Sequence, residues 1–134
     1  MLALSNDSRS VAAEALKFMD ICALDDIVIG TGVAALLSGQ QIAVFRPTAS
    51  GPLFALSNFD PFSKAFVMSR GILGDKGGVL KVASPIFKQN FALETGACLD
   101  DPAVSLPTYP VRVVNGRVLV GVGAHDTQAP GSTQ

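Results

Sequence analysis

Hydrophobic residues in this chain fall into short runs that are separated by glycine, proline and acidic pairs. Short apolar runs between turn residues favour β-strands, because core helices need longer segments with apolar residues three and four apart. The segments that predict strands are residues 18–24, 32–37, 41–46, 53–56, 79–83, 90–93, 97–99, 111–114 and 117–120. The pattern therefore predicts an all-β domain, a small antiparallel sandwich or barrel without a long core helix.

The links between these runs predict both hairpins and loops. Asn115-Gly116 supplies the positive φ angles that a two-residue type I′ turn requires. Ser38-Gly39-Gln40 is a short glycine-containing link that also suits a hairpin. Residues 59–78 hold many Gly and Pro residues and predict a long loop, and residues 84–89 predict a second loop. Long loops in a compact domain usually serve a function.

Both ends of the chain are expected to lie outside the domain. Residues 1–17 predict an N-terminal extension with a short helical turn after Ser10, and residues 121–134 predict a disordered tail. The domain would then span residues 18–120. The N-terminus has neither the basic leader nor the apolar run of a signal peptide, and no apolar run is long enough to cross a bilayer. We therefore expect a soluble, cytoplasmic protein that does not associate with membranes.

Charge adds a local feature that the net value of -1 hides. Residues 61–90 carry five basic side chains and one acidic one, so the rest of the chain has a surplus of acid. The low net charge argues against a general nucleic-acid binder, which needs a strong basic surplus. The basic segment would steer an acidic partner protein, and ordinary solvated loop charges explain it equally well.

The sequence lacks the residues that several kinds of catalysis require. His125 is the only histidine and falls in the predicted tail, so a Ser-His-Asp or Cys-His arrangement has no base. Cys22 and Cys98 have no second ligand at metal-binding spacing, and buried small hydrophobic residues are the better interpretation than a redox or metal role. The glycine-rich residues 71–78 lack the order of a phosphate-binding loop and favour a flexible loop.

Two segments resemble the two metal-binding loops of Rieske iron-sulfur domains. In that family one loop carries Cys-x-His and the other Cys-Pro-x-His-Gly, and the cysteines and histidines hold a 2Fe-2S cluster. Here the first loop reads NFDPF at residues 58–62, and the second reads SPIFKQNF at residues 84–91. The resemblance implies the Rieske-like fold, an antiparallel β-sandwich or barrel with two long loops at one tip.

The four positions that correspond to cluster ligands carry other residues: Asp60, Phe62, Ser84 and Phe87. A carboxylate, a hydroxyl and two benzene rings do not replace thiolates and imidazoles, so we expect no cluster and no metal in this chain. The two loops would then be held together by Phe62 packed against Phe87. A hydrogen bond between Asp60 and Ser84 would add to this contact.

Longer motifs over residues 18–120 resemble the small subunit of assimilatory NAD(P)H-dependent nitrite reductase. They read GVAALL at 32–37, QIAVFR at 41–46, DPFS at 60–63, SRGILGD at 69–75, KVASP at 81–85, CLDDP at 98–102 and YPVRV at 109–113. The resemblance implies an accessory subunit of an oxidoreductase of nitrogen metabolism. It also implies a large-subunit partner that holds siroheme, a 4Fe-4S cluster, FAD and NAD(P)H, and that reduces nitrite to ammonia.

No catalytic or cofactor-binding residue is expected in this chain itself. Docking on the large subunit is assigned, as a hypothesis, to the loop tips and to five basic residues: Lys64, Arg70, Lys76, Lys81 and Lys88. Two alternatives stay open. One is a Rieske-type ferredoxin that carries electrons, and the other is an adaptor module that keeps the fold without a link to nitrite.

Overall fold

The computed structural model describes residues 16–123. The helical turn predicted after Ser10 and the tail from residue 124 onward lie outside the described residues. The strands are β1 (Leu16–Ala23), β2 (Thr31–Leu37), β3 (Gln40–Arg46), β4 (Phe54–Ser57), β5 (Phe59–Asp60), β6 (Ala65–Phe66), β7 (Ile72–Lys76), β8 (Val79–Ala83), β9 (Asn90–Ala92), β10 (Thr108–Tyr109), β11 (Val111–Val114) and β12 (Arg117–Gly123). Two short 3-10 turns, η1 (Leu24–Asp26) and η2 (Met68–Arg70), complete the regular structure of this part, and the all-β prediction is confirmed.

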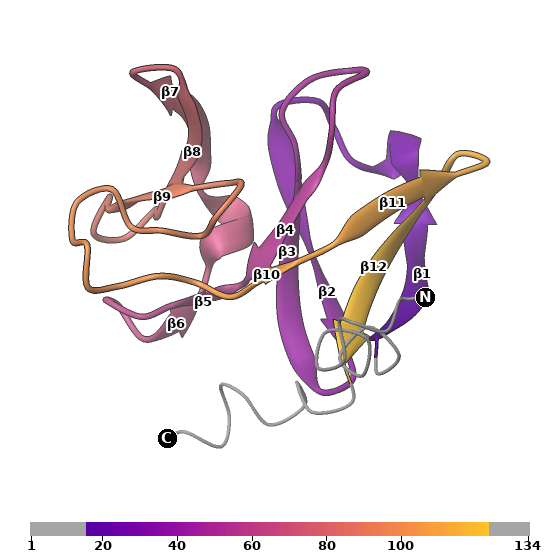
Figure 1. Cartoon of the computed structure of the whole chain (residues 1–134), viewed down its shortest axis with the longest axis horizontal. Helices are drawn as coiled ribbons and strands as arrows, with labels where there is room; N and C mark the ends of the chain where they lie inside the picture. Colours follow the sequence, from indigo (N-terminus) through magenta and orange to yellow (C-terminus); the bar gives the residue numbers. More distant parts are fainter. Residues whose placement is uncertain (1–15, 124–134) are drawn as a thin grey trace, which may run out of the picture.

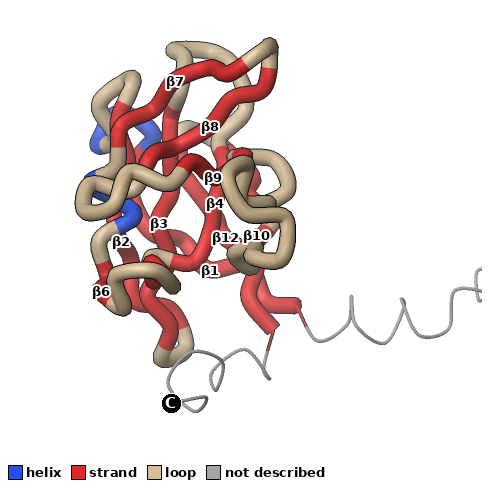
Figure 2. The backbone as a smooth tube through the Cα atoms, turned by 90° about the vertical axis from the view of Figure 1, so that its left-hand side faces the viewer, coloured by secondary structure: helices blue, strands red, loops and turns tan. Residues whose placement is uncertain are grey.

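The strands form two lobes (Figure 1). One lobe, here called the barrel lobe, contains the sheets β1-β12-β11 and β10-β4-β3-β2. The other, here called the turn lobe, contains the sheet β7-β8-β9, the hairpin β5-β6 and the loops between them. Figure 2, which views the molecule from the side of the turn lobe, shows β7, β8 and β9 lying across β3 and β4. The sheet β10-β4-β3-β2 is therefore the middle of three layers.

Strand β3 lies between two hydrophobic cores. Ile42 and Val44 belong to the core shared with β12, whereas Ala43 and Phe45 belong to the core shared with the turn lobe. Successive residues of a strand point to opposite faces, so a strand covered on both faces needs apolar residues at consecutive positions. The run IAVF at residues 42–45 meets this need, and all four residues are fully buried.

The hairpins predicted from sequence are present. Ser38 and Gly39 join β2 to β3 with φ angles of 51° and 81°, and Asn115 and Gly116 join β11 to β12 with φ angles of 50° and 76°. Both pairs have the positive φ values of a type I′ turn, whose twist matches that of the flanking strands. These two hairpins are confirmed.

The prediction of one long loop over residues 59–78 is wrong. This stretch contains the hairpin β5-β6, the turn η2 and the strand β7, which pairs with β8 along its whole length. The glycines of this stretch suggested loop structure. Gly71 has a different role, because a Cβ added there would lie 2.5 Å from the carbonyl oxygen of Ala83. Gly71 thus allows close packing beside a strand, which is a use that composition does not distinguish from a loop.

The predicted strand at residues 97–99 is reduced to isolated bridges, Phe91 with Cys98 and Ala97 with Ser105. At the end of the domain the structure contains a longer strand than the sequence predicts. Strand β12 continues through Gly123, so the predicted tail does not begin at Gly121. Val122 continues the inward alternation of Val118 and Val120 and is 2% exposed, which explains why the strand extends this far.

Candidate functional site

The two Rieske-like loops form a pair of five-residue turns with the same backbone geometry. We call residues 60–64 the Asp60 turn and residues 84–88 the Ser84 turn. In the Asp60 turn the amide of Lys64 donates to the carbonyl oxygen of Asp60 at 2.7 Å. In the Ser84 turn the amide of Lys88 donates to the carbonyl oxygen of Ser84 at 3.1 Å.

The side chains of the first residues repeat this correspondence. Asp60 Oδ1 accepts a hydrogen bond from the amide of Phe62 at 2.9 Å, and Ser84 Oγ accepts one from the amide of Ile86 at 3.3 Å. A proline follows in each turn, and its fixed φ suits the position after such a capping side chain. The fifth residue of each turn, Lys64 or Lys88, has a φ angle of 64° or 68°.

A hydrogen bond joins the first residues of the two turns. Ser84 Oγ donates to Asp60 Oδ2 at 2.5 Å, and Ser63 Oγ donates to the same oxygen at 2.8 Å. Asp60 and Ser84 are both fully buried. The predicted hydrogen bond between Asp60 and Ser84 is therefore confirmed, and it lies at the two positions that correspond to the cysteines of a Rieske domain.

The surroundings of Asp60 favour the ionised form of its carboxyl group. Burial is the largest single effect and would raise the pKa of Asp60, but the hydrogen bonds from Ser84, Phe62 and Ser63 together outweigh it. The pKa of Asp60 is held below its ordinary value as a result. A buried carboxylate is thus stabilised by donors from both turns.

The two phenylalanines at the positions of the Rieske histidines lie in different surroundings. The Phe62 ring packs on the core of the turn lobe, with its centroid 6.2 Å from that of Phe91. Phe87 is 57% exposed. The predicted packing of Phe62 against Phe87 is therefore wrong. Phe62 is the third residue of its turn and points inward, whereas Phe87 is the fourth residue and points to solvent.

These residues do not fit a 2Fe-2S cluster. The two inner positions hold a carboxylate and a hydroxyl that are bonded to each other, and the two outer positions hold hydrocarbon rings. Such a cluster needs thiolate and imidazole donors. Within residues 16–123, no three His, Cys, Asp or Glu side chains are grouped closely enough to hold a metal ion.

The five basic residues proposed for docking fall into two sets. Lys76 and Lys81 lie on β7 and β8, and the Lys76 ammonium is 3.8 Å from Asp100. Lys64, Arg70 and Lys88 are exposed and form no ion pair with any other residue between 16 and 123. The sequence grouped these five residues together because they share one segment, and the structure separates them.

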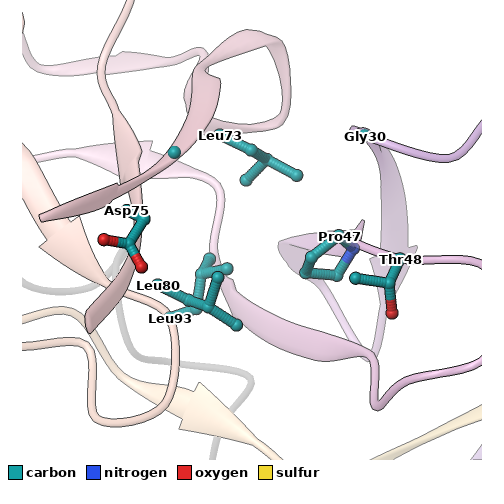
Figure 3. Close-up of a pocket in the computed structure, with 8 residues that line it drawn as sticks. Gly30, Pro47, Thr48, Leu73, Asp75, Leu80 and Leu93 are labelled. Carbon is teal, nitrogen blue, oxygen red and sulfur yellow. The ribbon is translucent and has the colours of Figure 1, made fainter. Parts of the chain in front are cut away.

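An apolar pocket of about 290 Å³ lies between the two lobes (Figure 3). Leu73, Leu80 and Leu93 line it from the turn lobe, and Pro47 and Thr48 face them from the barrel lobe. The lining offers one carboxylate, that of Asp75, one hydroxyl, that of Thr48, and no histidine, cysteine or lysine. This pocket has the shape of a recess between packed layers and lacks the convergent polar groups of a catalytic site.

Other sequence candidates have structural roles. Cys98 is buried in the core of the turn lobe, and Cys22 is partly buried against the core of the barrel lobe, which raises the pKa of its thiol. Gly77 and Gly78 have positive φ angles of 61° and 88° and form the turn between β7 and β8. The glycine-rich residues 71–78 are therefore a strand and a hairpin turn, and the predicted flexible loop is wrong.

The equivalence of the two turns was visible in the sequence and was missed. Both turns read as a polar capping residue, then Pro, two further residues and Lys. Ser63, which donates to Asp60, and Phe91, which packs on Phe62, were also absent from the predicted site. The signal for Ser63 was its place inside the first turn, close to a residue already singled out.

No helix within the described range is both long enough and apolar enough to cross a bilayer.

Residues 17–121 match the family model of the Rieske-like [2Fe-2S] domain. Sequence comparison finds 48% identity over 102 residues with the nitrite reductase (NADH) small subunit of Salmonella typhimurium. That match covers 76% of this chain and 94% of the relative.

Two further matches extend this relationship. The solution structure of the nitrite reductase [NAD(P)H] small subunit from Erwinia carotovora has a TM-score of 0.69 and 48% identity. The match covers 79% of this chain and 82% of that one. The nitrite reductase [NAD(P)H] large subunit of Klebsiella oxytoca is 44% identical over 101 residues, which are 75% of this chain and 10% of that protein. In that relative the matching segment is part of a much longer polypeptide.

Proposed function

Because the chain belongs to the Rieske-like small subunits of nitrite reductase, we propose that it is the accessory subunit of an NAD(P)H-dependent assimilatory nitrite reductase. In this role it binds a large subunit that reduces nitrite to ammonia. The chain contributes structure to the complex and carries no electrons itself. We include in this proposal the cytoplasmic location that the sequence predicts.

One observation supports the proposal that this chain transfers no electrons. The cysteine positions of the Rieske frame are occupied by Asp60 and Ser84, which are buried and hydrogen-bonded to each other. An electron carrier of this fold needs soft donors at these positions. The same observation argues against the alternative of a Rieske-type ferredoxin.

The identity of the partner is supported by the Klebsiella oxytoca relative, whose large subunit includes a segment similar to this chain. A domain that is covalently joined to a reductase in one protein has a natural partner in the same reductase where the two are separate. The siroheme, 4Fe-4S cluster, FAD and NAD(P)H that the reaction needs are assigned to this large subunit. Lys64, Arg70, Lys76, Lys81 and Lys88 are the basic residues from which we expect the docking contacts to be drawn.

The test is to produce this chain with and without the nitrite reductase large subunit of the same organism. The two chains are expected to purify as one complex with nitrite-dependent NAD(P)H oxidation. The small chain alone is expected to have neither activity nor iron and acid-labile sulfide above background. A 2Fe-2S electron paramagnetic resonance signal from the small chain alone would contradict the cluster-free role.

A complex that fails to form would contradict the accessory-subunit role. In that case, capture of this chain by an unrelated protein would favour the adaptor alternative.

A further inference from the structure

Lys64 and Lys88 adopt a backbone conformation that side chains other than glycine disfavour. Their φ angles are 64° and 68°, in the left-handed region, where an L-residue is less stable by about 1 kcal/mol. Ser38 and Asn115 also have positive φ angles, but they lie in two-residue hairpin turns. Glycine would satisfy the geometry at the two lysine positions without this cost.

Neither lysine has a structural partner that would explain its presence. Both side chains are exposed, and neither forms an ion pair with another residue in the range 16–123. Each residue supplies its turn with an amide that donates to the carbonyl oxygen four residues earlier, which any amino acid except proline would do. The side chain therefore adds only a positive charge, held at the fifth position of a fixed turn.

The hydrogen bond between Asp60 and Ser84 brings the two charges to the same end of the molecule. Each lysine follows its bonded residue by four positions in a turn of the same geometry. Next to them, Ile86 and Phe87 are 44% and 57% exposed. Two cations and two exposed apolar side chains are thus carried by one pair of joined turns.

We propose that Lys64, Ile86, Phe87 and Lys88, here called the turn surface, dock into an apolar recess with an acidic rim on the large subunit. This inference rests on the proposed function and narrows the docking hypothesis from five basic residues to two. Apolar side chains at the centre and charges at the edge are the usual arrangement of a specific protein interface. The strain in the two turns is consistent with residues kept for binding.

The remaining basic residues are less suited to this role. Lys76 and Lys81 lie on the β7-β8 hairpin, and both act on Asp100, whose pKa is lowered first by the amide of Asn90 and further by these two charges. They have an acidic neighbour within the chain. Arg70 is exposed at the end of η2, and among the basic residues between 16 and 123 only Lys64 and Lys88 have positive φ angles.

The test uses the full chain, the large subunit and the double variant Lys64→Gly/Lys88→Gly. Glycine relieves the left-handed strain, so the free energy of unfolding is expected to stay unchanged or to rise. Affinity for the large subunit at low salt is expected to fall about tenfold, with a weaker dependence on salt concentration. The matched control is Lys76→Ala/Lys81→Ala, which removes the same charge and is expected to bind within about twofold of the unchanged chain.

A second variant, Phe87→Ser, tests the apolar centre without altering any charge. Its affinity is also expected to fall about tenfold, and its salt dependence is expected to remain that of the unchanged chain. Normal affinity in both the double-glycine and the serine variants would overturn the turn surface while the accessory-subunit role stands. Equal losses in the double-glycine variant and the matched control would overturn it as well, because the effect would then be general charge. No binding by the unchanged chain would instead overturn the proposed function.

Discussion

The Asp60 turn and the Ser84 turn have the same backbone frame and present their aromatic side chains in opposite directions. Both begin with a buried polar residue, continue with proline and end with a left-handed lysine. Phe62 is the third residue of the first turn and packs on the core, whereas Phe87 is the fourth residue of the second and is 57% exposed. A shift of one position within the same frame therefore separates a core residue from a surface residue.

Within the two turns, different residues stabilise the fold and present an exposed surface for binding. The inner positions, Asp60 and Ser84, join the two turns through a buried hydrogen bond. The outer parts, Phe87 and the two lysines, contribute exposed surface. In a Rieske domain the metal cluster joins the two loops at their tips. Here the hydrogen bond between Asp60 and Ser84 joins them, so the buried link and the exposed surface can be changed by separate mutations.

The largest expected effect comes from Asp60→Ala, which removes the acceptor that both turns share. Ser84 Oγ, Ser63 Oγ and the amide of Phe62 would lose their partner; the first of these donors is buried and the other two are partly buried. We expect the free energy of unfolding to fall by about 3 kcal/mol. Urea denaturation followed by circular dichroism measures this loss.

The matched control for this variant is Asp75→Ala. Asp75 also accepts a turn amide, that of Gly78 at 3.0 Å, but it lies on the exposed β7-β8 hairpin. A loss below about 1 kcal/mol is expected there. If the two variants were equally destabilised, the link between the turns would count for no more than an ordinary surface turn.

The second effect contrasts the two phenylalanines directly. Phe62→Ala leaves a gap beside Phe91 and is expected to cost about 2 kcal/mol, less than for a fully buried ring because Phe62 is only partly buried. Phe87→Ala removes an exposed ring and is expected to change the free energy of unfolding by less than about 0.5 kcal/mol. Amide exchange of both turns should speed up only in the first variant. Comparable losses in both variants would contradict the exposed position of Phe87, because two rings packed against each other would both cost stability when removed.

The smallest effect is a pH dependence that only the Asp60 turn provides. The pKa of Asp60 is lower in the folded chain than in the unfolded one, so its contribution to stability is complete above the unfolded value, near 3.9. The contribution is lost as pH falls through the folded pKa. Asp60→Asn removes the titration, so the stability difference between the two proteins should be constant from about pH 6 to 8 and should shrink as pH falls below about 4. A difference that does not vary with pH would mean that the Asp60 carboxylate is not stabilised as an anion.

Much of the barrel lobe could be predicted from the sequence because its signals are local. Asn115-Gly116 specifies a turn by its backbone preferences, and the run at residues 42–45 specifies a strand buried on both faces. The turn lobe was predicted less well, because its glycines serve contacts between distant segments. A Cβ at Gly71 would collide with Ala83, and one at Gly96 would collide with the carbonyl oxygen of Leu106. Such demands appear only when both segments are in place.

The candidate site divides in the same way. The hydrogen bond between Asp60 and Ser84 could be predicted because the Rieske-like frame fixes where the first residues of two loops meet. The direction of Phe87 could not, because apolar character alone does not tell whether a loop residue packs inward or faces solvent. The separation of Lys76 from Lys64 and Lys88 also depends on the β7-β8 pairing, which the sequence pattern did not reveal.

The pairing of β1 with β12 sets Leu16 opposite Gly123, so the polypeptide enters and leaves the domain at neighbouring points. Both points belong to the barrel lobe, and the two turns belong to the other lobe (Figure 1). A tether attached at either point would leave the opposite end of the molecule uncovered. The domain can therefore be joined covalently to a longer polypeptide while Lys64 and Lys88 stay exposed.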